Sequence, residues 1–152
     1  MALQVLFVCT GNICRSPMAE GMLRAALPKD SGWRVASAGT STMDGFAASE
    51  HAISVMAENG ISLKTHRSQP VTDALAAQSA VIVVMTNRHA QIVGECFPGC
   101  RDRIYLMRSF DPDAPPQSDV GDPFGGTQGE YRACCATLQR SIPGLVKFLA
   151  EQ

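Results

Sequence analysis

A cysteine and an arginine near the amino terminus have the types and the spacing of a reactive pair. The apolar run Val5 to Val8 leads into Cys9, and a loop of five residues separates Cys9 from Arg15. A thiolate is a good nucleophile, and a guanidinium presents a planar fork that binds two phosphate oxygens at once, which lysine does not reproduce. The spacing therefore predicts a nucleophile that faces a clamp for an oxyanion.

The segments on either side of this loop are expected to be a strand and a helix. Residues 5–8 are continuous, apolar and rich in β-branched side chains, as in a strand buried on both faces of a parallel sheet. After the loop, Ser16 is a favourable N-cap and Pro17 suits the first helical position. The backbone N–H groups of residues 10–16 should then surround one point near the positive end of the helix dipole. We expect an anion to bind there and Cys9 to be ionised at neutral pH.

Several loop residues fit this interpretation. The Ser16 hydroxyl can donate a hydrogen bond to the Cys9 thiolate, and Gly11 and Asn12 are residue types that tolerate left-handed backbone in a tight loop. A simpler alternative is a strand, turn and helix in which Cys9 is merely buried and Arg15 is solvated. The joint spacing, the glycine and the strand-to-helix context favour a phosphate site.

Composition limits the class of protein. A chain of 152 residues with 45% hydrophobic residues fits one domain over residues 1–152. The net charge of −1 and the lack of a basic cluster argue against nucleic acid and anionic membranes as partners. The chain has six cysteines but no signal peptide and no apolar run of membrane-spanning length, which indicates reduced thiols in a cytoplasmic protein. We expect a monomer or weak dimer. Cys96 and Cys100 lack a second matching pair, which disfavours zinc.

Strands and helices alternate along the chain. Strands are expected over 4–9, 33–38, 80–85 and 103–107, and helices over 17–27, 47–59, 71–77, 87–96 and 128–150. This order predicts a three-layer α/β fold, in which helices cover both faces of a four-stranded parallel sheet. Gly60 is a typical left-handed stop for a helix, and Thr127 with Glu130 forms a capping box.

One long segment has no helical or strand period. Residues 108–126 contain four prolines and four aspartates, and such loops in compact domains are usually functional or disordered. The loop follows the last strand, so it should lie at the same sheet edge as Cys9. A phosphate ester needs a proton donor for its leaving oxygen, and a carboxylic acid can supply one. Spacing alone does not choose among the four candidates, Asp111, Asp113, Asp119 and Asp122.

The sequence resembles a known family. The segment Val-Cys-Thr-Gly-Asn-Ile-Cys-Arg-Ser-Pro-Met-Ala-Glu at 8–20 is similar to the signature of the low-molecular-weight protein tyrosine phosphatases. The resemblance continues through 37–39, 66–68 and 122–123, almost to the end of the chain. It implies a single α/β domain of the phosphotyrosine protein phosphatase I type, with no metal or cofactor, that acts on phosphorylated proteins.

The resemblance also implies roles for individual residues. It implies that Cys9 forms a phosphocysteine intermediate, that Arg15 clamps the phosphate and that Asp122 is the general acid and then the general base. His66 matches a position that hydrogen-bonds the loop asparagine, here Asn12, and Cys14 matches a second loop cysteine that can trap the oxidised nucleophile as a disulfide. The implied phosphate-binding residues are Thr10, Gly11, Asn12, Ile13, Cys14, Arg15 and Ser16, of which Asn12 and Ser16 also support the loop.

Two substrate classes remain open within the family. Phe124 stands where many members carry aromatic residues that flank the substrate ring, which favours phosphotyrosine. The sequence Asp-Pro-Phe-Gly-Gly at 122–126 instead resembles the protein-arginine phosphatase branch. That branch typically carries threonine where this chain has Ile13, whose hydrocarbon side chain offers only apolar contact in the substrate pocket. Phosphotyrosine is therefore the first choice and phosphoarginine the alternative.

Two further activities are disfavoured. An arsenate reductase of the same fold needs a relay thiol after strand 80–85, where this chain has Thr86, and Cys96 and Cys100 lie too far along the next helix. A module that carries a phosphoryl group on cysteine without hydrolysing it needs neither an arginine clamp nor an acid. The presence of Arg15 and Asp122 together favours a hydrolase.

Overall fold

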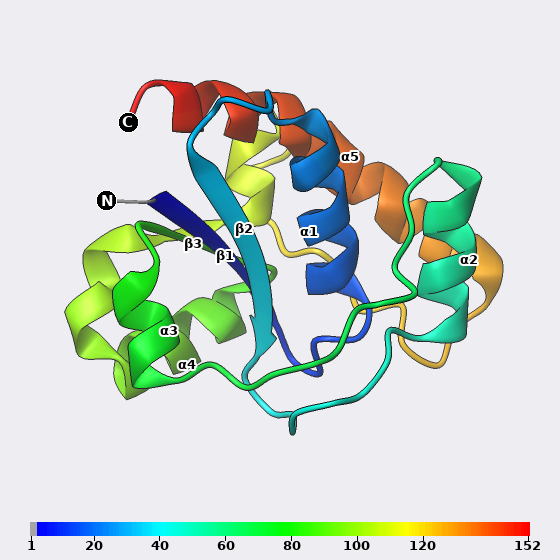
Figure 1. Cartoon of the computed structure of the whole chain (residues 1–152), viewed down its shortest axis with the longest axis horizontal. Coiled ribbons are helices and arrows are strands. Elements are labelled where there is room, and N and C mark those ends of the chain that lie inside the picture. Colours follow the sequence, from blue (N-terminus) through cyan, green and yellow to red (C-terminus); the bar gives the residue numbers. More distant parts are fainter. Residues whose placement is uncertain (1–2) are drawn as a thin grey trace.

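The computed structural model describes residues 3–152 and places a parallel sheet between two layers of helices (Figure 1). The strands, in the spatial order β2-β1-β3-β4, are β1 (Leu3–Cys9), β2 (Trp33–Gly39), β3 (Val81–Val84) and β4 (Ile104–Leu106). The α-helices are α1 (Arg15–Ala26), α2 (Glu50–Glu58), α3 (Asp73–Gln78), α4 (Asn87–Cys96) and α5 (Gln128–Ala150). Short 3₁₀ helices η1 (Pro98–Arg103) and η2 (Met107–Phe110) flank β4. The predicted three-layer α/β fold with four parallel strands is confirmed.

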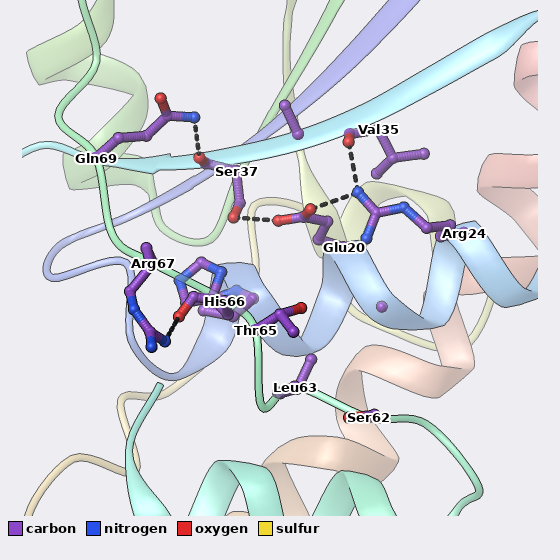
Figure 2. Close-up of a pocket in the computed structure, with 13 residues that line it drawn as sticks. Glu20, Arg24, Val35, Ser37, Ser62, Leu63, Thr65, His66, Arg67 and Gln69 are labelled. Carbon is purple, nitrogen blue, oxygen red and sulfur yellow. Dashed lines mark hydrogen bonds and ion pairs between the residues drawn. The ribbon is translucent and has the colours of Figure 1, made fainter. Parts of the chain in front are cut away.

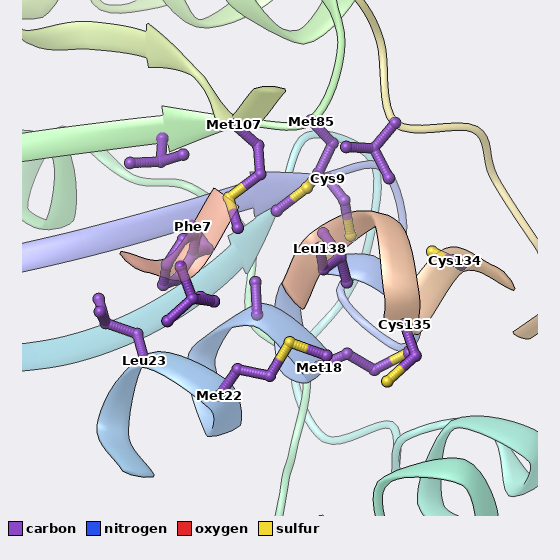
Figure 3. Packing of buried hydrophobic residues seen from close by; sticks show 14 of the residues in the cluster. Phe7, Cys9, Met18, Met22, Leu23, Met85, Met107, Cys134, Cys135 and Leu138 are labelled. Atoms are coloured by element: carbon purple, nitrogen blue, oxygen red, sulfur yellow. The ribbon is translucent and has the colours of Figure 1, made fainter. Parts of the chain in front are cut away.

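The central strand β1 is buried on both faces. Val5 and Phe7 belong to the apolar cluster formed with α1, α2 and α5, whereas Leu6 and Val8 belong to the cluster formed with α3 and α4. Figure 3 shows Phe7 among Met18, Met22 and Leu138 of the first cluster. Alternate side chains of a strand point to opposite faces, so a continuous apolar run suits a strand covered on both sides.

The start of α1 differs from the prediction. The helix begins at Arg15, its N-cap is Cys14, and no side chain caps it. Ser16 is therefore the second helical residue and not the N-cap, and Pro17 is the third and not the first. The serine hydroxyl contacts the Cys9 thiol inside the loop, so it is not used to cap a helix N–H group.

Other element boundaries shift by a few residues. The helix predicted from 47 begins at Glu50, because residues 47–49 run beside the first loop and the Ser49 N–H donates to the Ile13 carbonyl at 2.9 Å. Gly60 follows the end of α2 with φ of 75°, as predicted. The Thr127 hydroxyl accepts from the Glu130 N–H at 3.2 Å, as expected for the N-cap of α5.

The carboxyl ends of the strands bring three distant segments together. The loop after β1, the segment after β2 and the long loop that precedes α5 all lie at this edge (Figure 1). The Thr40 N–H donates to the Cys9 carbonyl at 2.9 Å, and the Val120 N–H donates to the Met85 carbonyl at 2.8 Å. These backbone hydrogen bonds fix the positions at which the flanking loops reach the first loop. No helix within residues 3–152 is long and apolar enough to cross a membrane.

Close packing of α5 on η2 gives a test of the fold. A Cβ atom at Gly144 would overlap the carbonyl oxygen of Phe110. Alanine normally stabilises a helix by about 1 kcal/mol relative to glycine, but we expect Gly144→Ala to lower the free energy of unfolding by about 1–3 kcal/mol, as overpacking does. Urea denaturation measures this change. The control Gly99→Ala places its Cβ in open space, and equal stability of the two variants would contradict the packing.

Candidate active site

One residue of the loop between β1 and α1 has a left-handed backbone. Asn12 has a left-handed backbone with φ of 57°, as predicted, whereas Gly11 does not adopt a left-handed conformation. The expectation for Gly11 is therefore wrong, since Asn12 alone among the residues of this loop has a positive φ. A non-glycine residue in this region costs on the order of 1–3 kcal/mol unless its surroundings hold it.

Hydrogen bonds on every side hold Asn12 in this conformation. Its fully buried side chain donates from Nδ2 to Ser16 Oγ at 2.8 Å and to Ser37 Oγ at 2.9 Å, and Oδ1 accepts from the Gln69 N–H at 3.0 Å. His66 Nε2 lies 2.7 Å from the Asn12 carbonyl oxygen. The structure thus brings His66 to Asn12 as expected, although the contact is to the backbone. Figure 2 shows Ser37, His66 and Gln69 around a second pocket behind the loop.

Cys9 ends β1 at the base of the loop. The residue is 2% exposed, and its Sγ lies 2.9 Å from Ser16 Oγ. Ser16 Oγ already accepts a hydrogen bond from Asn12, so its own hydrogen is free to point to the sulfur. The serine hydroxyl is therefore placed to donate a hydrogen bond to the Cys9 sulfur. The predicted contact between Ser16 and Cys9 is present.

Arg15 is a buried cation whose Nε atom has no hydrogen-bond partner among residues 3–152. Its side chain is 5% exposed, Nη1 donates to the Val120 carbonyl at 2.9 Å, and Nη2 lies 3.4 Å from Asp122 Oδ2. Nε is buried and has no hydrogen-bond partner within residues 3–152. A buried polar group without a partner costs on the order of 1–3 kcal/mol. An anion in front of the guanidinium would satisfy this donor.

Asp122 is held at the rim of the site. Its side chain is 48% exposed, and Oδ1 accepts from the Phe124 N–H at 3.0 Å while Oδ2 faces Arg15. The next residues form a turn in which the Gly126 N–H donates to the Pro123 carbonyl at 2.8 Å. These contacts fix the carboxyl group at the mouth of the pocket.

The other three candidate aspartates lie elsewhere. Asp111 is buried, and its Oδ2 lies 3.5 Å from Arg140 Nε of α5. Asp119 accepts from the N–H of Asn87 at 2.8 Å at the start of α4. Asp113 is exposed on the same loop. Asp122 is thus the one of the four that lines the pocket beside Cys9.

The pocket itself has a volume of about 210 Å³. Ligand sites for whole small molecules are usually about 300–1,000 Å³, so this size suits the head group of a side chain. Phe124 is 66% exposed at the rim. The lining residues are Cys9, Thr10, Gly11, Ile13, Cys14, Arg15, Asp122 and Phe124. The predicted residues Asn12 and Ser16 are fully buried and support the loop from behind.

Cys14 is held on the side of α5. Its Sγ lies 3.3 Å from the Tyr131 hydroxyl and 3.4 Å from Ser49 Oγ. Burial raises the pKa of the Cys14 thiol above its usual value, and burial also raises the pKa of Tyr131 to about 12. The sequence points to Cys14 but to neither partner, because no local pattern links Tyr131 or Ser49 to the loop.

His89 is a second residue that sequence reasoning missed. The residue is 3% exposed, its Nε2 lies 2.8 Å from Thr10 Oγ1, and its Nδ1 lies 3.0 Å from Thr86 Oγ1. Burial, and then the charge of Arg15, lower the pKa of His89 to about 4, although Asp119 and Asp122 oppose this shift. A lone histidine on a helix carries no signal of such a contact in the sequence.

Known proteins with a similar sequence share this architecture. Residues 4–152 match the family described as Low molecular weight phosphotyrosine protein phosphatase. The chain is 37% identical over 153 residues to a protein-arginine-phosphatase of Geobacillus stearothermophilus, covering 100% of this chain and 99% of the relative. It is 35% identical over 155 residues to low molecular weight protein-tyrosine phosphatase A of Mycobacterium bovis, covering 99% and 93%.

A solved structure has a fold similar to that of this chain. Wzb of Vibrio vulnificus in complex with benzylphosphonate superposes with a TM-score of 0.86 at 29% identity and covers 97% of this chain and 99% of that chain.

The lowered pKa of His89 predicts how stability depends on pH. The unfolded chain takes up a proton on this histidine near pH 6.5, but the folded protein does so only near pH 4, so folding stability falls as the pH drops through this range. Since one pKa unit corresponds to about 1.4 kcal/mol, we expect the stability advantage of the wild type over His89→Gln to shrink by up to about 3 kcal/mol between pH 7 and pH 4. Urea denaturation at several pH values measures this, and a difference that does not change with pH would contradict it.

Proposed function

The chain belongs to the low molecular weight phosphotyrosine protein phosphatase family, and on this premise we propose that it hydrolyses phosphotyrosine in proteins through a phosphocysteine on Cys9. Family membership makes the chain a phosphoric monoester hydrolase. The substrate and the roles of individual residues are proposed.

The observation that carries the proposal is the unpartnered Nε of Arg15. This donor is buried above a pocket that also contains Cys9, and Asp122 stands at the rim. A phosphate group in the pocket can accept from Nε and from the N–H groups of the loop while its phosphorus faces the sulfur. Such an arrangement stabilises the negative charge of the reacting phosphate without reorganisation, which is usually the largest contribution to catalysis.

The proposed reaction has two steps. The Cys9 thiolate attacks phosphorus, the bond from phosphorus to the leaving oxygen breaks, and the Asp122 carboxyl donates a proton to that oxygen. The Asp122 carboxylate then takes a proton from a water molecule, which attacks the phosphocysteine and releases phosphate and the thiolate. Arg15 and the loop N–H groups hold the phosphate oxygens in both steps.

The walls of the pocket favour phosphotyrosine. Ile13 and Phe124 offer apolar contact to an aromatic ring, and neither carries a hydrogen-bond donor or acceptor for a guanidinium group. A relative of the same fold is described in complex with benzylphosphonate, which combines an aromatic ring with a phosphate-like group. Phosphoarginine is the second candidate, because a relative named as a protein-arginine-phosphatase is as similar in sequence as a tyrosine phosphatase.

A redox role for Cys14 is part of the same proposal. Both Cys9 and Cys14 are free and buried, and Cys14 is the thiol proposed to trap an oxidised Cys9 as a disulfide. A monomeric or weakly dimeric state and a cytoplasmic location remain predictions from the sequence.

Variants of two residues test the mechanism. We expect Asp122→Ala to lower kcat on a phosphotyrosine peptide by roughly 10²–10⁴-fold, the usual contribution of a general acid. The loss should be much smaller on dinitrophenyl phosphate, because its leaving group needs no proton. Cys9→Ser should abolish turnover but still bind vanadate by calorimetry. Asp113→Ala, an exposed carboxylate of the same loop, is the control, and an Asp122→Ala enzyme with the same kcat as this control on the peptide would exclude the proposed acid.

Substitution at Ile13 tests the substrate. Ile13→Thr places a hydroxyl in the pocket wall, and we expect the ratio of kcat/KM for phosphoarginine over phosphotyrosine peptides to rise by about tenfold, since one hydrogen bond contributes about 1.4 kcal/mol. Ile13→Val introduces a side chain with the shape of threonine but without its hydroxyl, and it should leave this ratio near that of the wild type. If wild-type protein already prefers phosphoarginine, phosphotyrosine is not the substrate.

A further inference from the structure

The first turn of α4 lies between the two loops that form the pocket. It begins after the N-cap Thr86, whose Oγ1 accepts from the His89 N–H at 3.1 Å. On one side it reaches the loop after β1, and on the other it reaches the loop that carries Asp122. None of its residues is assigned a role in the proposed reaction.

His89 connects this turn to the residue that follows the nucleophile. Its ring lies between two hydroxyl groups, with Nε2 at 2.8 Å from Thr10 Oγ1 and Nδ1 at 3.0 Å from Thr86 Oγ1. Thr86 Oγ1 already accepts from a backbone N–H, so its own hydrogen is free for Nδ1. A neutral ring that accepts at Nδ1 carries its proton on Nε2 and donates it to Thr10.

The backbone of Thr10 is held by the segment that follows β2. The Ser41 N–H donates to the Thr10 carbonyl at 3.0 Å, and a Cβ atom at Gly39 would collide with that carbonyl oxygen. The segment after β2 therefore fixes the main chain of Thr10, and His89 fixes its side chain. Because Thr10 lines the pocket directly after Cys9, both contacts determine how the loop begins.

Asn87 connects the same turn to the acid loop. Its backbone N–H and its Nδ2 each donate to Asp119 Oδ1 at 2.8 Å, and Nδ2 also donates to the Gln117 carbonyl at 2.9 Å. The carbonyl of Val120, the residue after Asp119, accepts a hydrogen bond from Arg15 Nη1 at 2.9 Å. Two residues of one helical turn thus hold both sides of the pocket.

We propose that His89 is a positioning residue for the reaction, which as a neutral donor to Thr10 holds the phosphate-binding loop in register with the acid loop that Asn87 anchors. This inference rests on the proposed function, because the two loops carry the nucleophile and the acid assigned there. The charged groups that face the imidazole are Arg15, Asp119 and Asp122. The positive charge of Arg15 disfavours a second positive charge on the His89 ring. A neutral ring can still donate its Nε2 hydrogen to the Thr10 hydroxyl.

The tautomer gives a test that does not depend on activity. Nitrogen-15 NMR of the full chain distinguishes a protonated from an unprotonated imidazole nitrogen. We expect the His89 ring to be neutral at pH 7 with its proton on Nε2, both in the wild type and in the inactive Cys9→Ser variant. A charged ring, or a neutral ring with its proton on Nδ1, would overturn the proposal.

Kinetics on p-nitrophenyl phosphate give the second test. We expect His89→Leu to lower kcat by about tenfold or more, because small misplacements of reacting groups cost up to about 10²-fold. His89→Gln, whose amide nitrogen can replace Nε2–H, should recover most of that loss. Thr10→Val should resemble His89→Leu, and the double variant should show no further loss.

The outcomes separate this inference from the proposed function. Wild-type kcat in a folded His89→Leu protein, or equal losses in the Leu and Gln variants, would overturn the positioning role even if Cys9→Ser is inactive. Turnover retained by Cys9→Ser would instead overturn the proposed function, and the NMR result would still report on the contact with Thr10. Additive losses in the double variant would show that His89 does not act through Thr10.

Discussion

A buried positive charge at the carboxyl edge of the sheet is the constraint on which the site depends. The guanidinium of Arg15 is buried, and an ion removed from water is costly unless other groups compensate it. Its partners come from the long loop before α5, which supplies the Val120 carbonyl and the Asp122 carboxylate. The Arg15 side chain therefore helps to determine where this distant loop lies, and its Nε, which has no partner among residues 3–152, is available to a ligand.

The same edge shows how a strained loop is made rigid. The left-handed conformation of Asn12 is unfavourable for a residue with a Cβ atom, but three side-chain hydrogen bonds and the contact from His66 offset this cost. Ser16 links this network to the Cys9 thiol. Since the groups that would hold an anion are fixed before it arrives, they need no rearrangement during a reaction.

Local sequence patterns were sufficient to predict features that depend on residues close together in the chain. The apolar run before Cys9 and the alternation of strands and helices predicted the fold, and the spacing to Arg15 predicted that Cys9 and Arg15 face one place, because both follow from short-range geometry. Ser16 has the residue type of an N-cap, but it lies inside α1 and its hydroxyl contacts the Cys9 thiol. Gly11 has the residue type for a left-handed backbone, but Asn12 is the loop residue that has a positive φ.

The choice among the aspartates depended on contacts between distant segments. Asp111 and Asp122 both precede a proline, and only packing decides that the first meets Arg140 of α5 while the second meets Arg15. Tyr131, which contacts Cys14, and His89, which contacts Thr10, lie more than seventy residues from these partners in the chain. The sequence by itself determined the class of fold and the loop that brings Cys9 and Arg15 to one pocket, because these depend on local spacing and periodicity. Only the tertiary structure decided which carboxylate lines the pocket and which histidine contacts Thr10, because side chains from separate elements meet only when the sheet and its two helical layers have formed.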